Sequence, residues 1–271
     1  DIEYLALVPA VINPLFGAWD GVPLMGPRTV VTTAAPTSPP LRAKLVEMFP
    51  EANVLAAAGL SESLNLATQG PGEFLTDPES IGEPHVDTRV LILGDDDRVA
   101  PRGTPGHIAM RNFNTALGYH GNDAAGALTW RARKNDPEGL HWCFTGDIGV
   151  MDDDGRVTLV DRSKDVIKTG GESVPSVEVE TVYSEHSGIT DCAVIGVADE
   201  RWGEAIVLVV VRSDAEPDDA ALAEDLVRFG RERLAGFKLP KRIAFLDALP
   251  RSHFGKVLKR DLRDRKFDRI Y

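Results

Sequence analysis

The chain has 271 residues, 43% of them hydrophobic, and a net charge of −12 at neutral pH. This length corresponds to about two domains, and the apolar content is enough for a sizeable core. Because binding to a phosphate backbone needs a basic face, the acidic balance argues against nucleic acid as the main partner. No apolar run approaches the roughly 20 residues that span a bilayer, and residues 1–4 lack the features of a signal peptide.

The two cysteines, Cys143 and Cys192, are too few for a disulfide framework or a zinc site. A reducing, cytoplasmic setting is the simple interpretation of this usage. The sequence also starts without methionine, directly in an apolar segment, so we expect it to be a piece of a longer protein.

The first part of the chain has an α/β pattern. Residues 4–16 are apolar and broken by prolines, which predicts a helix with a proline-limited end. Residues 28–33 are rich in β-formers and predict a buried strand. Ser38 is placed to cap a helix over residues 41–49, and residues 54–57 predict another strand. The order strand, helix, strand indicates parallel pairing.

The middle of the chain changes composition to short β-like runs separated by Gly, Pro and Asp. We expect an antiparallel arrangement with strands at residues 89–93, 106–111, 147–151 and 157–160. The aspartate-rich stretches at residues 95–97 and 152–155 are typical of turns. They lack the ligand spacing and closing glutamate of a calcium loop.

The last part of the chain predicts a small α+β domain that is compact enough to fold alone. Its expected elements are a helix over residues 177–185, strands over 192–197 and 205–212, a helix over 218–234 and a strand over 243–246.

Several stretches have residue types suited to chemistry. Glu62, in Gly59-Leu60-Ser61-Glu62 after a strand, suits Mg²⁺, which prefers oxygen ligands; the alternative is a capping serine beside a solvated glutamate. Asp147, in Thr145-Gly146-Asp147, could accept hydrogen bonds from a ribose diol, as acidic residues do in dinucleotide folds; the alternative is a turn aspartate.

Three further stretches contain hinge or loop chemistry. Residues 161–165 are a serine with charged residues on both sides, and they lie where the composition of the middle part of the chain changes to that of the last part. This indicates a hinge or an exposed turn. The paired glycines Gly170 and Gly171 allow close backbone approach, although a plain hairpin turn would use them equally well. Near the C-terminus, Gly255-Lys256 presents a point charge that suits an anionic oxygen, and alone such a pair is usually ordinary surface.

Seven of these motifs occur in one order: Gly-Leu-Ser-Glu, Thr-Gly-Asp, Asp-Arg-x-Lys-Asp, Gly-Gly-Glu…Glu-Val-Glu, Val-Ile-Gly-Val-x-Asp-Glu-x-Trp-Gly-Glu, Gly-Phe-Lys-x-Pro-Lys and Pro-Arg-Ser-x-x-Gly-Lys-Val. This order resembles the adenylate-forming acyl- and aryl-CoA synthetases, and in particular the C-terminal half of a fatty-acyl-CoA-synthetase-like enzyme. The resemblance implies an α/β fold. Residues 1–161 would be the C-terminal part of a large α/β and β-barrel-like domain, residues 162–166 a hinge, and residues 167–271 a small mobile α+β lid domain.

The resemblance also implies an activity. Members of this family activate a carboxylic acid with ATP as an acyl-adenylate and transfer the acyl group to a thiol, usually that of CoA. Glu62 would bind Mg²⁺ and Ser61 the phosphates, while Asp147 would hold the ribose with help from Arg162. Lys256 would lie between the substrate carboxylate and the α-phosphate, where an ammonium stabilises charge that builds on oxygen. The rest of the ATP or AMP site would come from Ala34, Ala35, Pro36, Ala58, Gly59 and Leu60.

The small domain of such an enzyme rotates between two half-reactions, and the resemblance places its hinge at Lys164. Gly170, Gly171 and Glu172 would then shape the tunnel for the CoA thiol. Trp202 lies in the segment that resembles the CoA-side loop, where it would pack and not catalyse.

The departures from the family pattern lie mainly on the ATP side. Ala58 replaces a tyrosine that stacks on adenine, and residues 33–36 replace a glycine-rich adenine loop. His107 replaces a usual glutamate, Phe254 replaces a small residue, and residues 128–138 predict an added surface loop. The glycine-rich phosphate loop, with its lysine, is not among these residues. We therefore expect adenylation to need an upstream segment that carries this loop.

Three functions remain open from the sequence. The leading interpretation is an acid–CoA ligase; a second enzyme would transfer the acyl group to a carrier-protein phosphopantetheine; a third possibility is a non-catalytic homologue that lost the phosphate loop. The Trp202 segment favours CoA. The small side chains of Ala56, Ala57 and Ala58 would widen an acid pocket and suit a bulky fatty or aryl acid.

Overall fold

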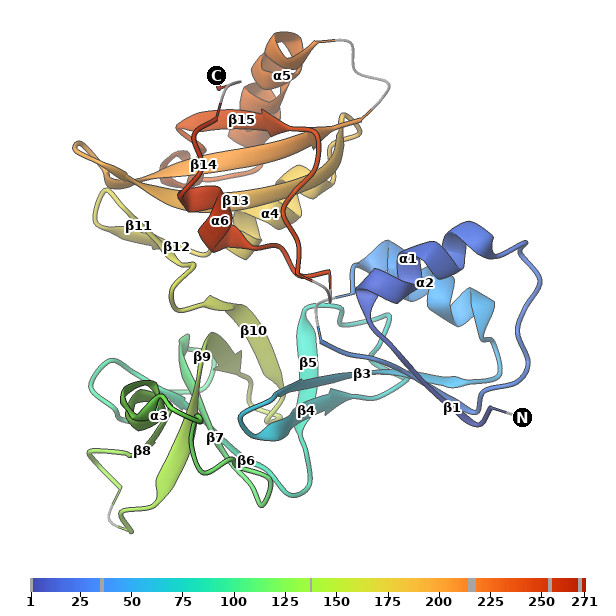
Figure 1. The fold of residues 1–271 in the computed structure, drawn as a ribbon, viewed down its shortest axis with the longest axis vertical. Coiled ribbons are helices and arrows are strands. Elements are labelled where there is room, and N and C mark those ends of the chain that lie inside the picture. The colour runs from blue at the N-terminus through green and yellow to red at the C-terminus, as the bar shows by residue number, and fades with distance from the viewer. Residues whose placement is uncertain (1, 35–36, 137, 214–217, 253–254, 268–269) are drawn as a thin grey trace. The chain divides into compact units, whose positions relative to one another are not determined.

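The computed structural model describes the whole chain apart from residues 1, 35–36, 137, 214–217, 253–254 and 268–269. The chain divides into two compact units (Figure 1). Unit 1 comprises Asp1–Leu159 with His253–Gly255, and unit 2 comprises Val160–Ser252 with Lys256–Tyr271. Within the described part of the chain, no helix is both long enough and apolar enough to cross a bilayer.

A long mixed sheet forms the framework of unit 1, in the strand order β1-β2-β3-β4-β5-β10-β9-β7-β6, with β8 paired to β9. Its strands are β1 (Tyr4–Leu7), β2 (Thr29–Thr32), β3 (Asn53–Leu60), β4 (Leu64–Gln69), β5 (Ser80–Pro84), β6 (Arg89–Leu93), β7 (Gly106–Arg111), β8 (Trp130–Ala132), β9 (His141–Met151) and β10 (Val157–Arg162), whose last three residues are assigned to unit 2. The helices of this unit are α1 (Pro9–Ala18), α2 (Pro39–Met48) and α3 (Asp123–Thr129).

The first three strands are parallel, as the strand–helix–strand pattern predicts. Helices α1 and α2 pack on them through Ile12, Leu45 and Met48, all fully buried. The expectation of one helix over residues 4–16 is wrong in its first part. Residues 4–7 are strand β1, paired with β2 from Tyr4↔Thr29 to Leu7↔Thr32, and the helix begins only at Pro9. A partner strand more than twenty residues away decides this conformation, so local periodicity does not reveal it.

From β4 onward the pairings are antiparallel, as expected for the middle of the chain. Buried Leu66, Ile108, Met110 and Cys143 form the core of this region. The expected surface loop over residues 128–138 is partly wrong, because Trp130–Ala132 form β8 and pair with β9.

Unit 2 is built on a sheet of order β12-β11-β14-β13, with β15 on the other edge of β14. Its strands are β11 (Ile167–Thr169), β12 (Glu172–Val174), β13 (Ile189–Asp199), β14 (Gly203–Arg212) and β15 (Arg242–Leu246). Its helices are α4 (Ser176–Ser184), α5 (Asp219–Arg231), the 3₁₀ turn η1 (Gly236–Lys238) and α6 (Lys259–Arg263).

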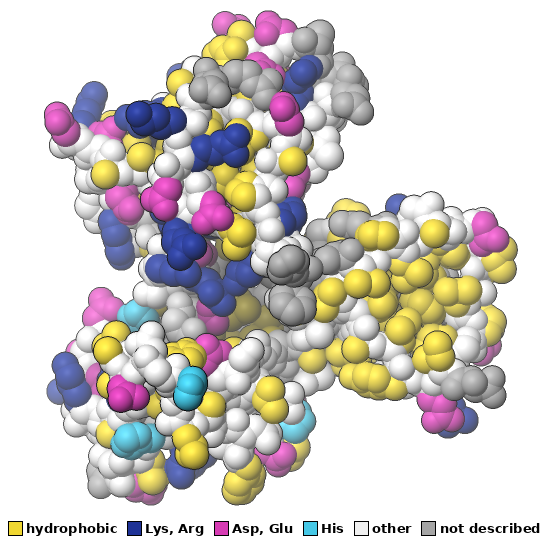
Figure 2. Space-filling model, in the orientation of Figure 1, with side chains coloured by type: hydrophobic (Ala, Val, Ile, Leu, Met, Phe, Trp, Pro, Cys, Tyr) yellow, Lys and Arg dark blue, Asp and Glu magenta, His cyan; other side chains and the backbone are white. Residues whose placement is uncertain are grey.

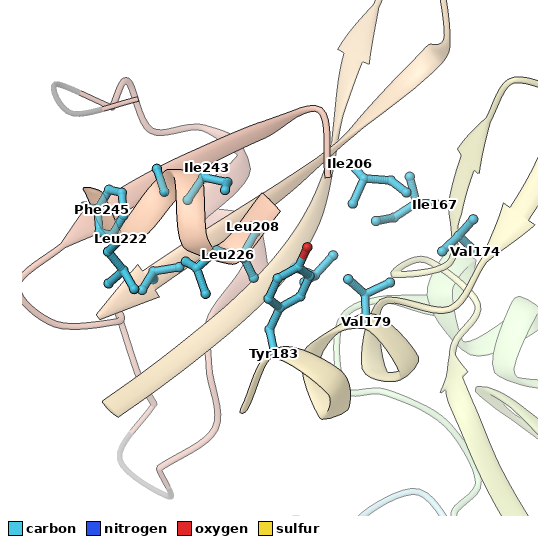
Figure 3. Packing of buried hydrophobic residues seen from close by; sticks show 13 residues of the cluster. Ile167, Val174, Val179, Tyr183, Ile206, Leu208, Leu222, Leu226, Ile243 and Phe245 are labelled. Atoms are coloured by element: carbon cyan, nitrogen blue, oxygen red, sulfur yellow. The ribbon is translucent and has the colours of Figure 1, made fainter. Parts of the chain in front are cut away.

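Strand β14 is apolar throughout because both of its faces are covered. Leu208 and its same-face neighbours meet Val179, Tyr183 and Leu226 from α4 and α5 (Figure 3). On the opposite face, Val207 and its neighbours belong to a second cluster, which includes Leu262 of α6. Burial on two faces accounts for the run of β-branched residues at this position in the sequence.

Candidate functional site

The turn between β3 and β4 holds the predicted metal ligand. Glu62 is half-buried there, and its Oε1 accepts a hydrogen bond of 2.7 Å from the Tyr119 hydroxyl. Its backbone carbonyl accepts a second bond of 2.8 Å from the Ala116 amide. Among the described residues, no group donates to Oε2. One carboxylate oxygen is therefore anchored while the other remains available to a cation, and Ser61 beside it is exposed.

A polar network beneath this turn was not foreseen from the sequence. The hydroxyl of fully buried Ser63 lies 2.8 Å from the Thr115 hydroxyl, and the Asn112 amide donates to the Ser63 carbonyl at 2.7 Å. The same amide bonds the Thr88 hydroxyl at 3.1 Å, which itself donates to the Asn65 carbonyl at 2.7 Å. Because buried polar groups need partners, this network fixes the shape of the Glu62 turn.

Ala34 and Ala58 reach the same edge of the parallel strands. Thr32 is paired with Ala56; Ala34 follows the end of β2 by two residues, and Ala58 lies two residues further along β3. The carboxyl edge of a parallel sheet is where such folds bind ligands. Ala34 has φ of 72°, in the left-handed region that favours glycine. The neighbouring predicted residues Ala35 and Pro36 lie outside the described residues.

Residues 58–60 belong to strand β3, so the expectation that Gly59 and Leu60 follow a strand is corrected. Ala58 faces Ala67 across the β3–β4 pair. A Cβ at Gly59 would lie 2.4 Å from the Leu64 carbonyl oxygen, so only glycine allows the two strands to approach here. The sequence predicted that this strand ends at residue 57. Pairing with β4 extends β3 to Leu60, and the local sequence does not reveal that pairing.

Asp147 lies on a bulge inside β9, and not where a loop enters a strand. The pairing passes from Ala109↔Phe144 to His107↔Ile148, so β9 has two extra residues between these pairs. Gly146 has φ of 77°, and the Asp147 amide donates to the Thr145 hydroxyl at 3.1 Å. Bulges re-aim side chains and are frequent beside active sites.

His107, one of the departures from the family pattern, lies on β7 beside this bulge. Its Nε2 is 3.3 Å from Oδ1 of the exposed Asp95.

In unit 2, the predicted hinge residues Arg162 and Lys164 are exposed, whereas Asp161 and Asp165 are buried. The Asp161 carboxylate accepts hydrogen bonds from the Ser176 hydroxyl at 2.6 Å and from the Val177 amide at 3.4 Å. It therefore caps helix α4, whose own N-cap residue makes no side-chain bond. Sequence reasoning missed this role because the cap lies fifteen residues before the helix.

The paired glycines form a two-residue β-hairpin between β11 and β12. Thr169 is paired with Glu172, and Gly170 and Gly171 have φ of 60° and 88°. Two successive positive φ values are the requirement of a type I′ turn, so the plain hairpin is the local structure. This hairpin rests on Trp202, whose carbonyl accepts a 2.8 Å bond from the Gly170 amide.

Two cations lie close to the ring of Trp202. The Arg201 guanidinium carbon and the Lys241 ammonium nitrogen each lie 4.8 Å from the indole ring centroid. An aromatic face flanked by positive charge suits a stacked base with phosphates nearby.

Lys256 is exposed on a hairpin whose arms are joined by three backbone contacts. The Ser252 amide donates to the Lys256 carbonyl at 2.8 Å, the Leu258 amide donates to the Pro250 carbonyl at 2.8 Å, and Arg251 pairs with Val257. Phe254, a predicted departure, lies outside the described residues. The structure thus places Ala34, Ala58 and Glu62 in unit 1, and Lys164, Trp202 and Lys256 in different segments of unit 2.

The described residues include no cluster of three or more His, Cys, Asp or Glu that could hold a metal alone. Mg²⁺ often uses one or two carboxylates and takes its other ligands from water and substrate phosphates. Glu62, with one oxygen anchored by Tyr119, fits such a site.

Comparison with known proteins identifies the family. The description "AMP-binding enzyme" matches residues 1–120, and "AMP-binding enzyme C-terminal domain" matches residues 178–256. A long-chain-fatty-acid–CoA ligase from Escherichia coli O6:H1 is 37% identical over 211 residues, which is 78% of this chain and 36% of that protein. The chain belongs to the AMP-binding, adenylate-forming enzyme family.

Solved structures agree with this assignment. The o-succinylbenzoate CoA synthetase of Bacillus subtilis in complex with its acyl-adenylate intermediate matches with a TM-score of 0.81 at 26% identity, over 98% of this chain and 51% of that one. The same enzyme with ATP and a magnesium ion matches with a TM-score of 0.79 at 25% identity, over 97% and 51%. The predicted fold class is confirmed. The chain spans between 36% and 51% of the length of these relatives.

Proposed function

We propose that this chain is the C-terminal part of an ATP-dependent acid–thiol ligase, which forms an acyl-AMP and transfers the acyl group to CoA. The observation that supports it most is the presence, in one chain, of two kinds of site. One is the anchored Glu62 carboxylate in unit 1, and the other is the cation-flanked Trp202 in unit 2. Relatives named as CoA ligases and synthetases, one solved with an acyl-adenylate, support the same reaction.

On the nucleotide side, Glu62 would hold Mg²⁺ and Ser61 would contact the phosphates. Ala34, Ala58 and their neighbours would line the adenine, and Asp147 would bond the ribose together with Arg162. The Mg²⁺ would neutralise charge on the phosphates when bound. This chain's own contribution is orientation, because the network around Ser63 holds the Glu62 turn in one shape.

On the thiol side, unit 2 would act as the small lid, with residues 162–166 as the hinge and Lys164 as its pivot. The exposed Lys256 ammonium would approach the carboxylate and the α-phosphate during adenylation. Gly170, Gly171 and Glu172 would shape the thiol path in the second half-reaction, with the CoA nucleotide near Trp202. The Arg201 and Lys241 charges suit the phosphates of CoA.

The phosphate loop would come from a segment upstream of residue 1. Several apolar side chains of the first twenty-five residues are exposed, and such a face is typical of a surface that another segment covers. They are Ile2, Tyr4, Val11, Val22, Leu24 and Met25, and Figure 2 shows hydrophobic side chains gathered where α1 and α2 lie.

The first measurement is the intact mass and N-terminal sequence of the natural protein, followed by pyrophosphate exchange with a panel of fatty and aryl acids. We expect a longer chain, exchange that needs Mg²⁺, and transfer to CoA in preference to a carrier-protein phosphopantetheine. A natural protein that starts at Asp1, or a longer one without exchange for any acid, would contradict the proposal. Lys256→Ala serves as the inactive control for adenylation.

A further inference from the structure

The hairpin that presents Lys256 is fastened to unit 2 through both of its arms. On the first arm, the Arg251 guanidinium lies 2.5 Å from the Asp191 carboxylate on β13. The second arm runs directly into helix α6, since Leu258 is the N-cap of that helix. The orientation of α6 therefore sets the position of the arm that ends in Lys256.

Helix α6 has only five residues, and so short a helix has no stability of its own. Its apolar anchor is Leu262, which is fully buried against β13 and β14. Its polar anchors are Lys259 and Arg263, whose side chains are 14% and 26% exposed. Arg260 on the same helix is 87% exposed, so the basic run has an inward side and an outward side. Figure 2 shows Lys and Arg side chains around the position of α6.

Lys259 is the centre of a buried polar chain. Its ammonium lies 2.7 Å from Oε1 of Glu180 and donates to the Ser176 hydroxyl at 2.6 Å. The same hydroxyl donates to the Asp161 carboxylate at 2.6 Å. A hydroxyl that accepts from one group and donates to another fixes the direction of both bonds. Lys259 is thus connected, through one serine, to Asp161, the residue directly before the predicted hinge (residues 162–166).

Arg263 binds two residues inside the hinge, Lys164 and Asp165. Its guanidinium lies 2.7 Å from the Asp165 carboxylate, which is 10% exposed, and 3.4 Å from the Lys164 carbonyl. The residues between the two anchored aspartates, from Arg162 to Lys164, are exposed. One short helix thus continues the Lys256 hairpin and also holds the backbone before and within the hinge, at Asp161 and at Asp165.

We propose that Lys259 and Arg263 are positioning residues, which lock the hinge segment and the Lys256 hairpin into one rigid piece. When unit 2 rotates about the hinge, Lys256 then moves with it and keeps its position relative to the hinge residues. This proposal rests on the proposed function for its catalytic consequence. Its structural part concerns α6, residues 161–165 and the two arms of the hairpin, all of which lie in unit 2. Exposed ion pairs contribute little, but a largely buried ammonium that is bonded to one carboxylate and one hydroxyl is costly to remove.

The test compares Lys259→Met and Arg263→Met with Arg260→Met as the matched control, in the natural full-length protein. Two activities are measured: pyrophosphate exchange, which needs Lys256 in place, and thiol transfer from supplied acyl-adenylate. We expect Lys259→Met to lower exchange at least tenfold, to leave thiol transfer within about twofold, and Lys259→Arg to restore most of the exchange. Arg260→Met should leave both rates unchanged.

A second readout does not depend on the reaction. Amide hydrogen exchange at Ser252 and Leu258 should rise at least tenfold in Lys259→Met, while exchange in β13 and β14 stays as in the parent. Equal loss of both half-reactions, or unchanged amide exchange in the hairpin, would overturn the proposal. If Lys259→Met does not fold, Ser176→Ala replaces it as the test. This variant removes the hydrogen bonds from Lys259 to Asp161 through Ser176 but keeps the Lys259–Glu180 ion pair, and the same comparison of pyrophosphate exchange with thiol transfer applies. Absence of exchange in the parent protein with normal hairpin protection would instead count against the proposed function.

Discussion

The Tyr119 hydroxyl donates a 2.7 Å hydrogen bond to Oε1 of Glu62, 57 residues earlier in the chain. Burial raises the pKa of Tyr119, and the bond to Glu62 raises it further, so the hydroxyl stays protonated and remains a donor. The Tyr119 ring is held by Trp130, with ring centroids 4.7 Å apart. The carboxylate is therefore oriented by a side chain that is itself fixed by packing.

For Tyr119→Phe we expect the Mg²⁺ concentration at half-maximal pyrophosphate exchange to rise about tenfold. The reason is that groups which orient a metal ligand are typically worth 10- to 100-fold in metal affinity. The stability of the fold should change little, since the ring is kept. Tyr4→Phe, at an exposed tyrosine of the same unit, is the control. An unchanged Mg²⁺ dependence would show that Glu62 needs no orientation by Tyr119.

Ala34→Gly should stabilise unit 1 by about 1 kcal/mol. Ala34 has φ of 72°, and an L-residue with a side chain pays roughly 1–2 kcal/mol there, partly offset by the extra freedom of glycine in the unfolded chain. The measurement is urea unfolding of the variant and of Ala127→Gly, an exposed alanine in helix α3. The control should be destabilised by up to about 1 kcal/mol. If both variants change the free energy of unfolding in the same direction, the left-handed conformation of Ala34 is contradicted.

Arg42→Met should destabilise unit 1 by about 3–5 kcal/mol. Arg42 is 5% exposed, and its guanidinium donates to the Thr37 carbonyl at 2.9 Å, to Oε1 of Gln69 at 2.5 Å and to the Phe74 carbonyl at 2.9 Å. Removal leaves three buried acceptors without a donor, and each costs about 1–3 kcal/mol. Urea unfolding would measure this, with Arg89→Met, at the exposed first residue of β6, as the control. A loss under 1 kcal/mol would refute the argument.

The two thiols predict a fall of stability in alkali. Burial raises the pKa of Cys143 to about 12 and that of Cys192 to about 12, and nearby carboxylates add to both shifts. Because the folded state holds these protons more tightly than the unfolded state, the stabilisation is complete below the unfolded pKa near 9 and is lost as the pH rises toward 12.

The measurement is the free energy of unfolding between pH 8 and pH 11 for the parent, Cys143→Ala and Cys192→Ala. Each thiol should contribute a slope that approaches about 1.4 kcal/mol per pH unit above its unfolded pKa. Each substitution should remove one thiol's contribution to the slope of the unfolding free energy against pH, whatever it does to the stability at pH 8. If the parent and the variants give parallel curves of unfolding free energy against pH, the thiols have the same pKa in the folded and unfolded states.

Much of the fold was predictable because local pattern and burial agree. The run from Ile206 to Val211 predicts a buried strand, and β14 is covered on both faces. The helix expected over residues 218–234 appears as α5, capped by Asp218, whose side chain accepts from the Ala220 amide. The errors at residues 4–7 and 130–132 share one cause, since both stretches are strands because of a partner strand outside the stretch itself: β2 for residues 4–7, and β9 for residues 130–132.

The site divides in the same way. The sequence by itself determined which residue types stand at Glu62, Asp147, Trp202 and Lys256, and their order indicated the family, because reactive groups must be present whatever the fold. Only the tertiary structure decided what orients them: Tyr119 on Glu62, the bulge under Asp147 and the Lys259 chain behind Lys256. These contacts join residues that are far apart in the sequence, so they depend on how the chain folds and cannot be predicted from the spacing of residues.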